Sequence, residues 1–139
     1  MPTYETQTDL DNESRVMQAI ADKYGLQLRK CPERYRMDAV FLKGGDIYCL
    51  VEFKRRNIAS TKYPTFFISL SKAMAASEIR DQTGIPVYLV VEWLDMIGRI
   101  DIRAYSEVTI GGRKDRDDPN DYDLVAHYDI KNFERLDLF

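Results

Sequence analysis

Three residues in the middle of the chain, Asp38, Glu52 and Lys54, carry side chains that together suit hydrolysis of a phosphodiester. Glu52 and Lys54 are two residues apart, so in a strand they point to the same face. An aspartate on the neighbouring strand, facing Glu52, would complete a pair of carboxylates, which are ligands that Mg²⁺ prefers. A lysine about 7 Å further along that face can hold or deprotonate an attacking water and offset transition-state charge. These three residues therefore predict metal-dependent phosphodiester hydrolysis.

An acid-x-lysine triplet is a weak signal alone, and the chain holds a second one, Asp129-Ile130-Lys131. That second triplet lies in an acidic segment, with no acid across a glycine hairpin and no amphipathic helix after it. Glu52 and Lys54 instead adjoin apolar neighbours, and both residue types are depleted in strands that are buried on both faces. The alternative is a cross-strand ion pair at the end of a sheet, with Asp38 in solvent.

Two strand-like runs, 38–42 and 47–53, flank Lys43-Gly44-Gly45-Asp46, which favours a hairpin. Both runs have apolar residues on both faces, which predicts a position in the middle of a covered sheet. Pairing residue 42 with 47 would set Asp38 opposite Val51. Pairing 42 with 48, with a bulge at the glycines, would set Asp38 opposite Glu52. We predict the second register.

The N-terminal segment predicts an amphipathic helix of about 11 to 16 residues that ends at Gly25. Its candidate caps are Thr8, Asp11 and Asn12. Its predicted buried stripe comprises Val16, Met17, Ile20 and Tyr24. Glu13 lies within about 60° of every residue of that stripe, which places an acid on the apolar face. The alternative is a partly solvated acid that favours the helix dipole.

Pro64 predicts a second helix over residues 65–83, closed by Gly84. One predicted face comprises Phe66, Phe67, Leu70, Ala73 and Met74, and Lys72 lies within a second apolar side. Lys72 could equally pack its stem on that side and leave its ammonium in solvent. We predict three further strands, over 87–93, 100–105 and 124–130, the last of them at an edge of the sheet. A charged loop over 111–121 and an apolar C-terminus complete a mixed α/β domain. The C-terminal apolar residues are Phe133, Leu136 and Phe139.

The charge distribution favours a polyanionic partner near the proposed site, although the formal net charge of the chain is -3. Residues 29–62 hold nine basic and four acidic side chains, a net of +5. The last 25 residues carry -5, and we expect them to lie away from the polymer or to shield the site. The basic side chains of residues 29–62 could contact phosphates of a nucleic acid; the alternative is that they lie in solvated loops. The candidate nucleic-acid-binding residues are Arg34, Arg36, Arg55, Arg56, Lys62 and Tyr63.

With 139 residues and no composition shift, the chain predicts one domain over 1–139, with a core over about 13–93 and a C-terminal extension over about 94–139. Two cysteines are too few for a disulfide scaffold. No apolar stretch reaches the roughly 18 residues that cross a bilayer, and the N-terminus is polar and acidic. These features predict a soluble, cytoplasmic protein with no membrane partner.

The order of these features resembles the PD-(D/E)XK nuclease superfamily. The order is a helix with an inward glutamate, an aspartate that starts a strand, a turn, Glu-x-Lys in the next strand, and then a helix and a strand. That superfamily includes restriction endonucleases, Holliday-junction resolvases and VRR-type nucleases, and the resemblance covers roughly residues 13–93. It implies a restriction-endonuclease-like core, a central mixed β-sheet flanked by helices. Met37 stands where the motif has proline.

The resemblance also implies roles for individual residues. Asp38 and Glu52 match the metal-binding acids and Lys54 matches the catalytic lysine. The Phe53 carbonyl is a further candidate ligand for Mg²⁺ or Mn²⁺. Glu13 matches a first-helix acid that some members place beside the metal, and Lys72 matches a Gln or Lys that some members project from the following helix.

We therefore expect a metal-dependent nuclease that hydrolyses nucleic-acid phosphodiesters, with DNA as the favoured substrate. The alternative from another class is a catalytically inactive nucleic-acid-binding or assembly module with the same fold. A third, weaker alternative is a phosphohydrolase of free nucleotides. Resolvase-like relatives are typically dimers, so the resemblance also allows a homodimer.

Overall fold

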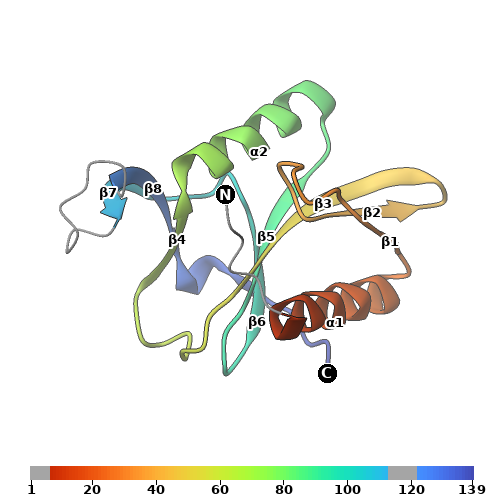
Figure 1. The fold of residues 1–139 in the computed structure, drawn as a ribbon, viewed down its shortest axis with the longest axis horizontal. Coiled ribbons are helices and arrows are strands. Elements are labelled where there is room, and N and C mark those ends of the chain that lie inside the picture. Colours follow the sequence, from red (N-terminus) through yellow and green to blue (C-terminus); the bar gives the residue numbers. More distant parts are fainter. Residues whose placement is uncertain (1–6, 113–121) are drawn as a thin grey trace.

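The computed structural model describes the backbone of residues 7–112 and 122–139. A six-stranded sheet, in the order β1-β2-β3-β5-β6-β9, forms its centre, and a second sheet has the order β4-β8-β7. The two α-helices lie on opposite sides of the central sheet (Figure 1). The predicted α/β class, a central mixed sheet flanked by helices, is confirmed. None of the described helices is long and apolar enough to span a membrane.

The central sheet contains β1 (Gln27–Lys30), β2 (Ala39–Lys43), β3 (Asp46–Arg55), β5 (Val87–Glu92), β6 (Ile97–Asp101) and β9 (Glu134–Arg135). The second sheet contains β4 (Thr65–Ser69), β7 (Glu107–Gly112) and β8 (Tyr122–Asp129). The helices are α1 (Gln7–Tyr24), α2 (Leu70–Thr83) and the short 3-10 helix η3 (Ile130–Asn132). In the central sheet, β3 and β5 are parallel neighbours, and a parallel pair needs a crossover connection. Here β4 and α2 supply that connection.

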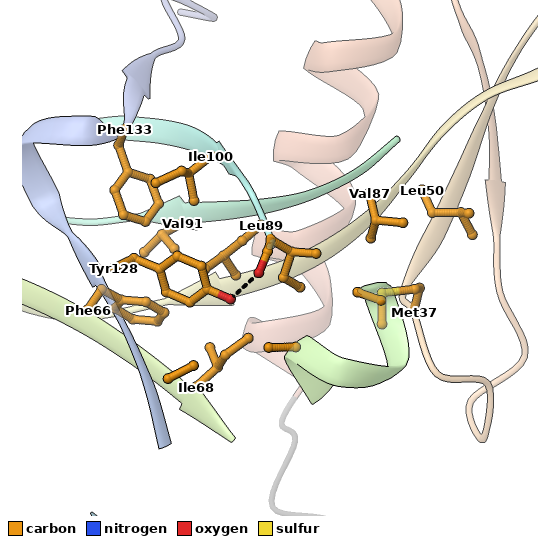
Figure 2. Packing of buried hydrophobic residues seen from close by; sticks show 14 of the residues in the cluster. Met37, Leu50, Phe66, Ile68, Val87, Leu89, Val91, Ile100, Tyr128 and Phe133 are labelled. Atoms are coloured by element: carbon orange, nitrogen blue, oxygen red, sulfur yellow. Dashed lines mark hydrogen bonds between the residues drawn. The ribbon is translucent and has the colours of Figure 1, made fainter. Parts of the chain in front are cut away.

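Two apolar cores lie on the two faces of the central sheet. Under α1, Val16 and Met17 pack against a core that includes Val51 and Phe53 of β3. Under α2, Leu50 belongs to a larger core that also takes in residues of the second sheet. Figure 2 shows this larger core, in which the buried Tyr128 hydroxyl donates a hydrogen bond of 2.5 Å to the Ile102 carbonyl. Successive residues of β3 therefore point to different layers.

The β2–β3 hairpin sets Asp38 opposite Glu52 by a different route from the predicted one. Leu42 pairs with Ile47, so the predicted pairing of 42 with 48 and the bulge at the glycines are wrong. Gly44 and Gly45 both have positive φ, 59° and 87°, which suits a tight two-residue turn. The extra residue lies inside β3, because Phe41 pairs with Cys49 and Leu42 with Ile47. Between this extra residue and the pair of Ala39 with Val51, the two strands keep the register that brings Asp38 next to Glu52.

The predicted helix over residues 65–83 is wrong in its first five residues. Thr65–Ser69 form β4, which pairs with β8, and α2 begins only at Leu70. Phe66 and Ile68 are buried while Phe67 is half exposed, the alternation of a strand rather than the stripe of a helix. The far end of the prediction is confirmed, because Gly84 caps α2 in the left-handed conformation.

Other boundaries also differ. Helix α1 has 18 residues and begins before all three predicted caps. Gly25 follows its end, as predicted. Its buried stripe is completed by Ala21 rather than by Tyr24. The strand expected over 100–105 is β6, at Ile97–Asp101. Strand β8, predicted at an edge, is the central strand of its sheet, and β7 was not predicted. Residues 113–121 of the expected charged loop lie outside the described part of the chain. Phe133 and Leu136 are buried, whereas Phe139 is 76% exposed.

Candidate active site

Strand β3 directs Glu52 and Lys54 toward the α2 side of the central sheet. Their neighbours Val51 and Phe53 pack into the core under α1, so alternation turns the even-numbered residues the other way. Glu52 is only 3% exposed. The Lys54 ammonium lies 3.6 Å from Oε2 of Glu52. The expected placement of an acid and a lysine on one strand face is therefore present.

Asp38 is held against this pair by two hydrogen bonds to β3. Its backbone N–H donates to the Val51 carbonyl at 3.0 Å, and the Phe53 N–H donates to its Oδ2 at 2.7 Å. These bonds tie Asp38 to β3 directly after the last pair of the β2–β3 ladder, Ala39 with Val51. They bring the two carboxylates close enough for Asp38 to raise the pKa of Glu52.

Helix α2 adds a second ammonium. Lys72 Nζ lies 3.6 Å from Oε1 of Glu52 and donates a hydrogen bond of 2.7 Å to the Arg36 carbonyl. The lysine therefore points toward the site and bridges to the segment that precedes Asp38. This position comes from the helix beginning at Leu70, directly after β4.

The electrostatics of Glu52 fit a cation at this place. Burial is the main cause that raises its pKa to about 7, Asp38 adds to the rise, and the two lysines oppose it. Its Oε1 atom is buried and accepts no hydrogen bond from the described residues. A buried acceptor without a donor is costly, and a hard cation would satisfy it with ligands that such ions prefer. Asp38 and Glu52 are therefore the side chains that could hold a divalent ion, and no contact in the described residues shows the orientation of the Phe53 carbonyl toward them.

Glu13 is buried, with 7% exposure, but the structure does not gather it with Asp38 and Glu52. Its carboxylate forms an ion pair of 2.7 Å with Lys30 of β1. Helix α1 packs on the face of the sheet that carries Val51, and Lys30 is the partner that the Glu13 carboxylate contacts there. In the described residues no three acidic, histidine or cysteine side chains form a ready cluster for a metal. Sequence reasoning missed Lys30 as the partner, because only the β1–β2 pairing brings it near α1.

The predicted nucleic-acid-binding residues fall into separate places. Arg34 is exposed, and Arg36, also exposed, lies 3.7 Å from Glu78 of α2. Arg55 is 3.3 Å from Glu92, on the face that α1 covers. Arg15 of α1 contacts the same Glu92 at 2.5 Å, a network that no sequence pattern indicated. Arg55 is thereby separated from Lys54 by the sheet.

Arg56, Lys62 and Tyr63 lie beyond the end of β3, on the segment that leads to β4. Arg56 stacks over the Phe66 ring at 4.8 Å, and the Lys62 ammonium is 5.7 Å from the Tyr63 ring centre. Tyr63 is 57% exposed. This segment is held by Asp95, which accepts hydrogen bonds from the N–H and the hydroxyl of Ser60 at 2.7 Å each. No sequence pattern indicated that anchor.

Comparisons with known proteins identify a family and a similar fold. The model of a family described as "Phage putative PDDEXK endonuclease" matches residues 1–136. Among solved structures, the chain is similar to Hjc of Archaeoglobus fulgidus, a Holliday junction resolvase from an archaeal hyperthermophile. The TM-score is 0.64 at 11% identity, over 91% of this chain and 90% of that one. A comparison with curated protein sequences finds no match.

Proposed function

The chain belongs to the phage PDDEXK endonuclease family, and from that premise we propose that it is a metal-dependent endonuclease that hydrolyses DNA phosphodiester bonds. One observation carries the proposal: the buried Glu52 carboxylate faces Asp38 and two ammonium groups, and within the described part of the chain no group donates a hydrogen bond to its Oε1. A buried carboxylate with an oxygen that accepts no hydrogen bond contributes little to the stability of the fold. It gains a role when a cation binds.

In this proposal Asp38, Glu52 and the Phe53 carbonyl hold Mg²⁺ or Mn²⁺, and Glu13, whose carboxylate is paired with Lys30, is a further candidate ligand that would have to leave that ion pair and move toward the site. When bound, the cation supplies Lewis-acid stabilisation of charge on the phosphoryl oxygens. Lys54 is the residue that orients the attacking water and offsets negative charge in the transition state. Lys72 holds the segment before Asp38 through the Arg36 carbonyl, and its ammonium lies beside the Glu52 carboxylate.

In the same proposal, the basic side chains around the site contact the DNA backbone. Arg34 and Arg36 precede the aspartate and Arg56 and Lys62 follow the lysine, so positive charge brackets the acids along the chain. Phosphate contacts from arginine and lysine position a strand without reading its sequence. Arg55 is the weakest member of this set because Glu92 already pairs with it.

We further propose that the enzyme works in the cytoplasm as a homodimer. Cys31 and Cys49 are both free thiols, as expected in a reducing compartment. Sedimentation of the purified protein tests the second point, and a monomer at the concentration used for cleavage would contradict it.

Cleavage of labelled DNA tests the main proposal. Single-stranded, duplex, flapped and four-way-junction substrates are incubated with Mg²⁺, Mn²⁺ or EDTA, with the parent protein and the Glu52→Gln variant. We expect products only with a divalent ion and only from the parent protein. Cleavage that persists in EDTA, or that Glu52→Gln leaves intact, would refute it. Binding of DNA without any cleavage would favour an inactive binding module.

A further inference from the structure

The face of β3 that carries Glu52 and Lys54 leads directly into a cavity. Arg56, two residues beyond Lys54, follows on that side and stacks on Phe66 of the core under α2. Arg56 also lines a cavity of about 200 Å³ between the β3–β4 segment, β4 and the end of β5. We call this cavity the β3–β4 pocket. Its lining includes the rings of Tyr63, Phe66, Phe67 and Trp93.

The β3–β4 pocket combines ring faces with a cation that has no acidic partner. The guanidinium of Arg56 lies 4.8 Å from the centre of the Phe66 ring, and none of the ion pairs found among the described residues includes it. Tyr63 and Phe67 are 57% and 50% exposed, although both line the cavity. The guanidinium also donates a hydrogen bond of 3.1 Å to the Arg55 carbonyl. Exposed rings beside an arginine without an acidic partner in the described residues are features with which proteins stack nucleobases.

The pocket is held open by contacts outside its aromatic lining. Ser60 is buried and donates both its N–H and its hydroxyl to Asp95. The Leu94 N–H donates to the Ile58 carbonyl at 3.1 Å, and the Ile130 N–H donates to the Pro64 carbonyl at 3.0 Å. These bonds fix the β3–β4 segment at its middle and its end. A ligand would therefore meet a formed site and would lose little free energy in ordering it.

The size and position of the pocket suit one base of a strand that passes the active site. An engineered cavity of about 150 Å³ takes up benzene, so 200 Å³ is enough for an aromatic ring. Arg56 comes four residues after Glu52, directly after the end of β3, which corresponds to about 13 Å at roughly 3.3 Å per residue. Each strand of a duplex has one phosphate per about 3.4 Å of axis. The pocket thus lies within about four nucleotides of the phosphate at Glu52.

A second hollow adjoins the first and extends its polar rim. It measures about 610 Å³ and shares Ser60, Tyr63 and Ile130 with the β3–β4 pocket. Lys62 and Lys131 lie on this hollow, with Asp129 as the one acid in its lining. Two ammonium groups beside the mouth would meet the phosphates on either side of a base held in the pocket.

We propose that the β3–β4 pocket receives one unpaired base of the DNA strand that is cut. The inference rests on the proposed nuclease function and names its substrate class: DNA with an unpaired nucleotide near the scissile phosphate, in preference to continuous duplex. A base inside an intact duplex is stacked and paired, and its extrusion costs free energy that a nucleotide already unpaired does not require.

A cleavage assay with a matched pair of tyrosines tests the preference. Tyr63→Ala removes a ring from the pocket; Tyr24→Ala removes one from the end of α1, where Tyr24 is 40% exposed and has the Lys23 ammonium 5.6 Å away. Two substrates are compared, a continuous duplex and the same duplex with one unpaired nucleotide. We expect the parent to cut the second substrate about tenfold faster, and Tyr63→Ala to lose that preference. Tyr24→Ala should retain it.

Fluorescence separates this inference from the function on which it rests. Glu52→Gln is mixed with single strands that carry 2-aminopurine at successive positions, in Ca²⁺ so that no strand is cut. We expect quenching at one position, absent when Tyr63→Ala is added to the variant. Equal cleavage of both substrates by the parent, or unchanged preference in Tyr63→Ala, would overturn the pocket inference and leave the nuclease intact. No cleavage of any substrate would refute the nuclease, and quenching lost with Tyr63 would still support the pocket.

Discussion

Two triplets in this chain share the spacing of an acid and a lysine but differ in backbone structure and surroundings. Glu52-Phe53-Lys54 lies wholly within β3, so its acid and lysine share one face. In Asp129-Ile130-Lys131, the aspartate is the last residue of β8 and η3 begins at Ile130, so the backbone turns inside the triplet. Glu52 is buried, whereas Asp129 is half buried and Lys131 is exposed. The spacing acquires chemical meaning only where an extended backbone runs through all three residues.

The surroundings of the two acids differ as well. Glu52 has Asp38 on the neighbouring strand and a lysine from α2 beside its buried oxygen. Asp129 pairs in the ladder with Thr65 and borders an open hollow. A buried acid among other charges is a recurrent feature of functional sites. The comparison teaches that neighbours from separate segments, rather than the triplet, distinguish a site from a coincidence.

The largest expected effect is the loss of cleavage in Glu52→Gln. The substitution keeps the shape of the side chain but removes the charge that would hold a cation, and we expect the rate to fall at least a hundredfold to a thousandfold. Asp129→Asn is the matched control and should cut within about twofold of the parent. Initial rates on one labelled substrate with saturating Mg²⁺ measure both. Equal losses in the two variants would abolish the distinction between the triplets.

Replacement of the lysines should give a smaller but clear contrast. We expect Lys54→Ala to reduce the rate about a hundredfold, because one preorganised group near the developing charge contributes on that scale. Lys131→Ala should leave the rate unchanged on continuous duplex, since no strand face connects it to the acids. Metal titration followed by calorimetry should still show binding to Lys54→Ala. If Lys54→Ala cuts as well as the parent, Lys54 is not the catalytic lysine.

A pH experiment on stability extends the comparison beyond catalysis. The folded-state pKa of Glu52, about 7, lies above its ordinary value of 4.5. Between these values the folded state binds more protons than the unfolded state, so this group makes the free energy of unfolding fall as pH rises from about 4.5 to 7. In EDTA at pH 8, we expect Glu52→Gln to be more stable than the parent by on the order of 2 kcal/mol. Near pH 4 the two should converge.

Urea unfolding at both pH values measures this difference, with Asp129→Asn as the control that should show no such pH-dependent gain. A parent protein more stable than Glu52→Gln at pH 8 in EDTA would contradict the cost assigned to the buried carboxylate. The expected pattern opposes that of the cleavage assay, because the same charge that destabilises the metal-free fold is the one that would hold the cation.

The sequence predicted the local part of the site and missed what distant segments decide. Alternation along β3 was enough to put Glu52 and Lys54 on one face. The facing of Asp38 and Glu52 was also predicted, but the bulge was placed at the glycines, because nothing local marks the extra residue within β3. Thr65–Ser69 is a strand because β8, some 60 residues later, pairs with it, and pairing of this kind lies outside any local window.

The smallest expected effect concerns Lys72, which has no counterpart beside Asp129. Its ammonium lies 3.6 Å from Oε1 of Glu52 and donates a hydrogen bond of 2.7 Å to the Arg36 carbonyl. We expect Lys72→Met to lower the maximal rate about tenfold, because the segment before Asp38 loses an anchor. The same variant should be half-saturated at less Mg²⁺, since a positive charge beside the carboxylate has gone. Lys72→Arg keeps the charge and should retain both values within about threefold. If Lys72→Met matches the parent in rate and in metal requirement, the lysine serves only packing, and Asp38 with Lys54 alone would distinguish Glu52 from Asp129.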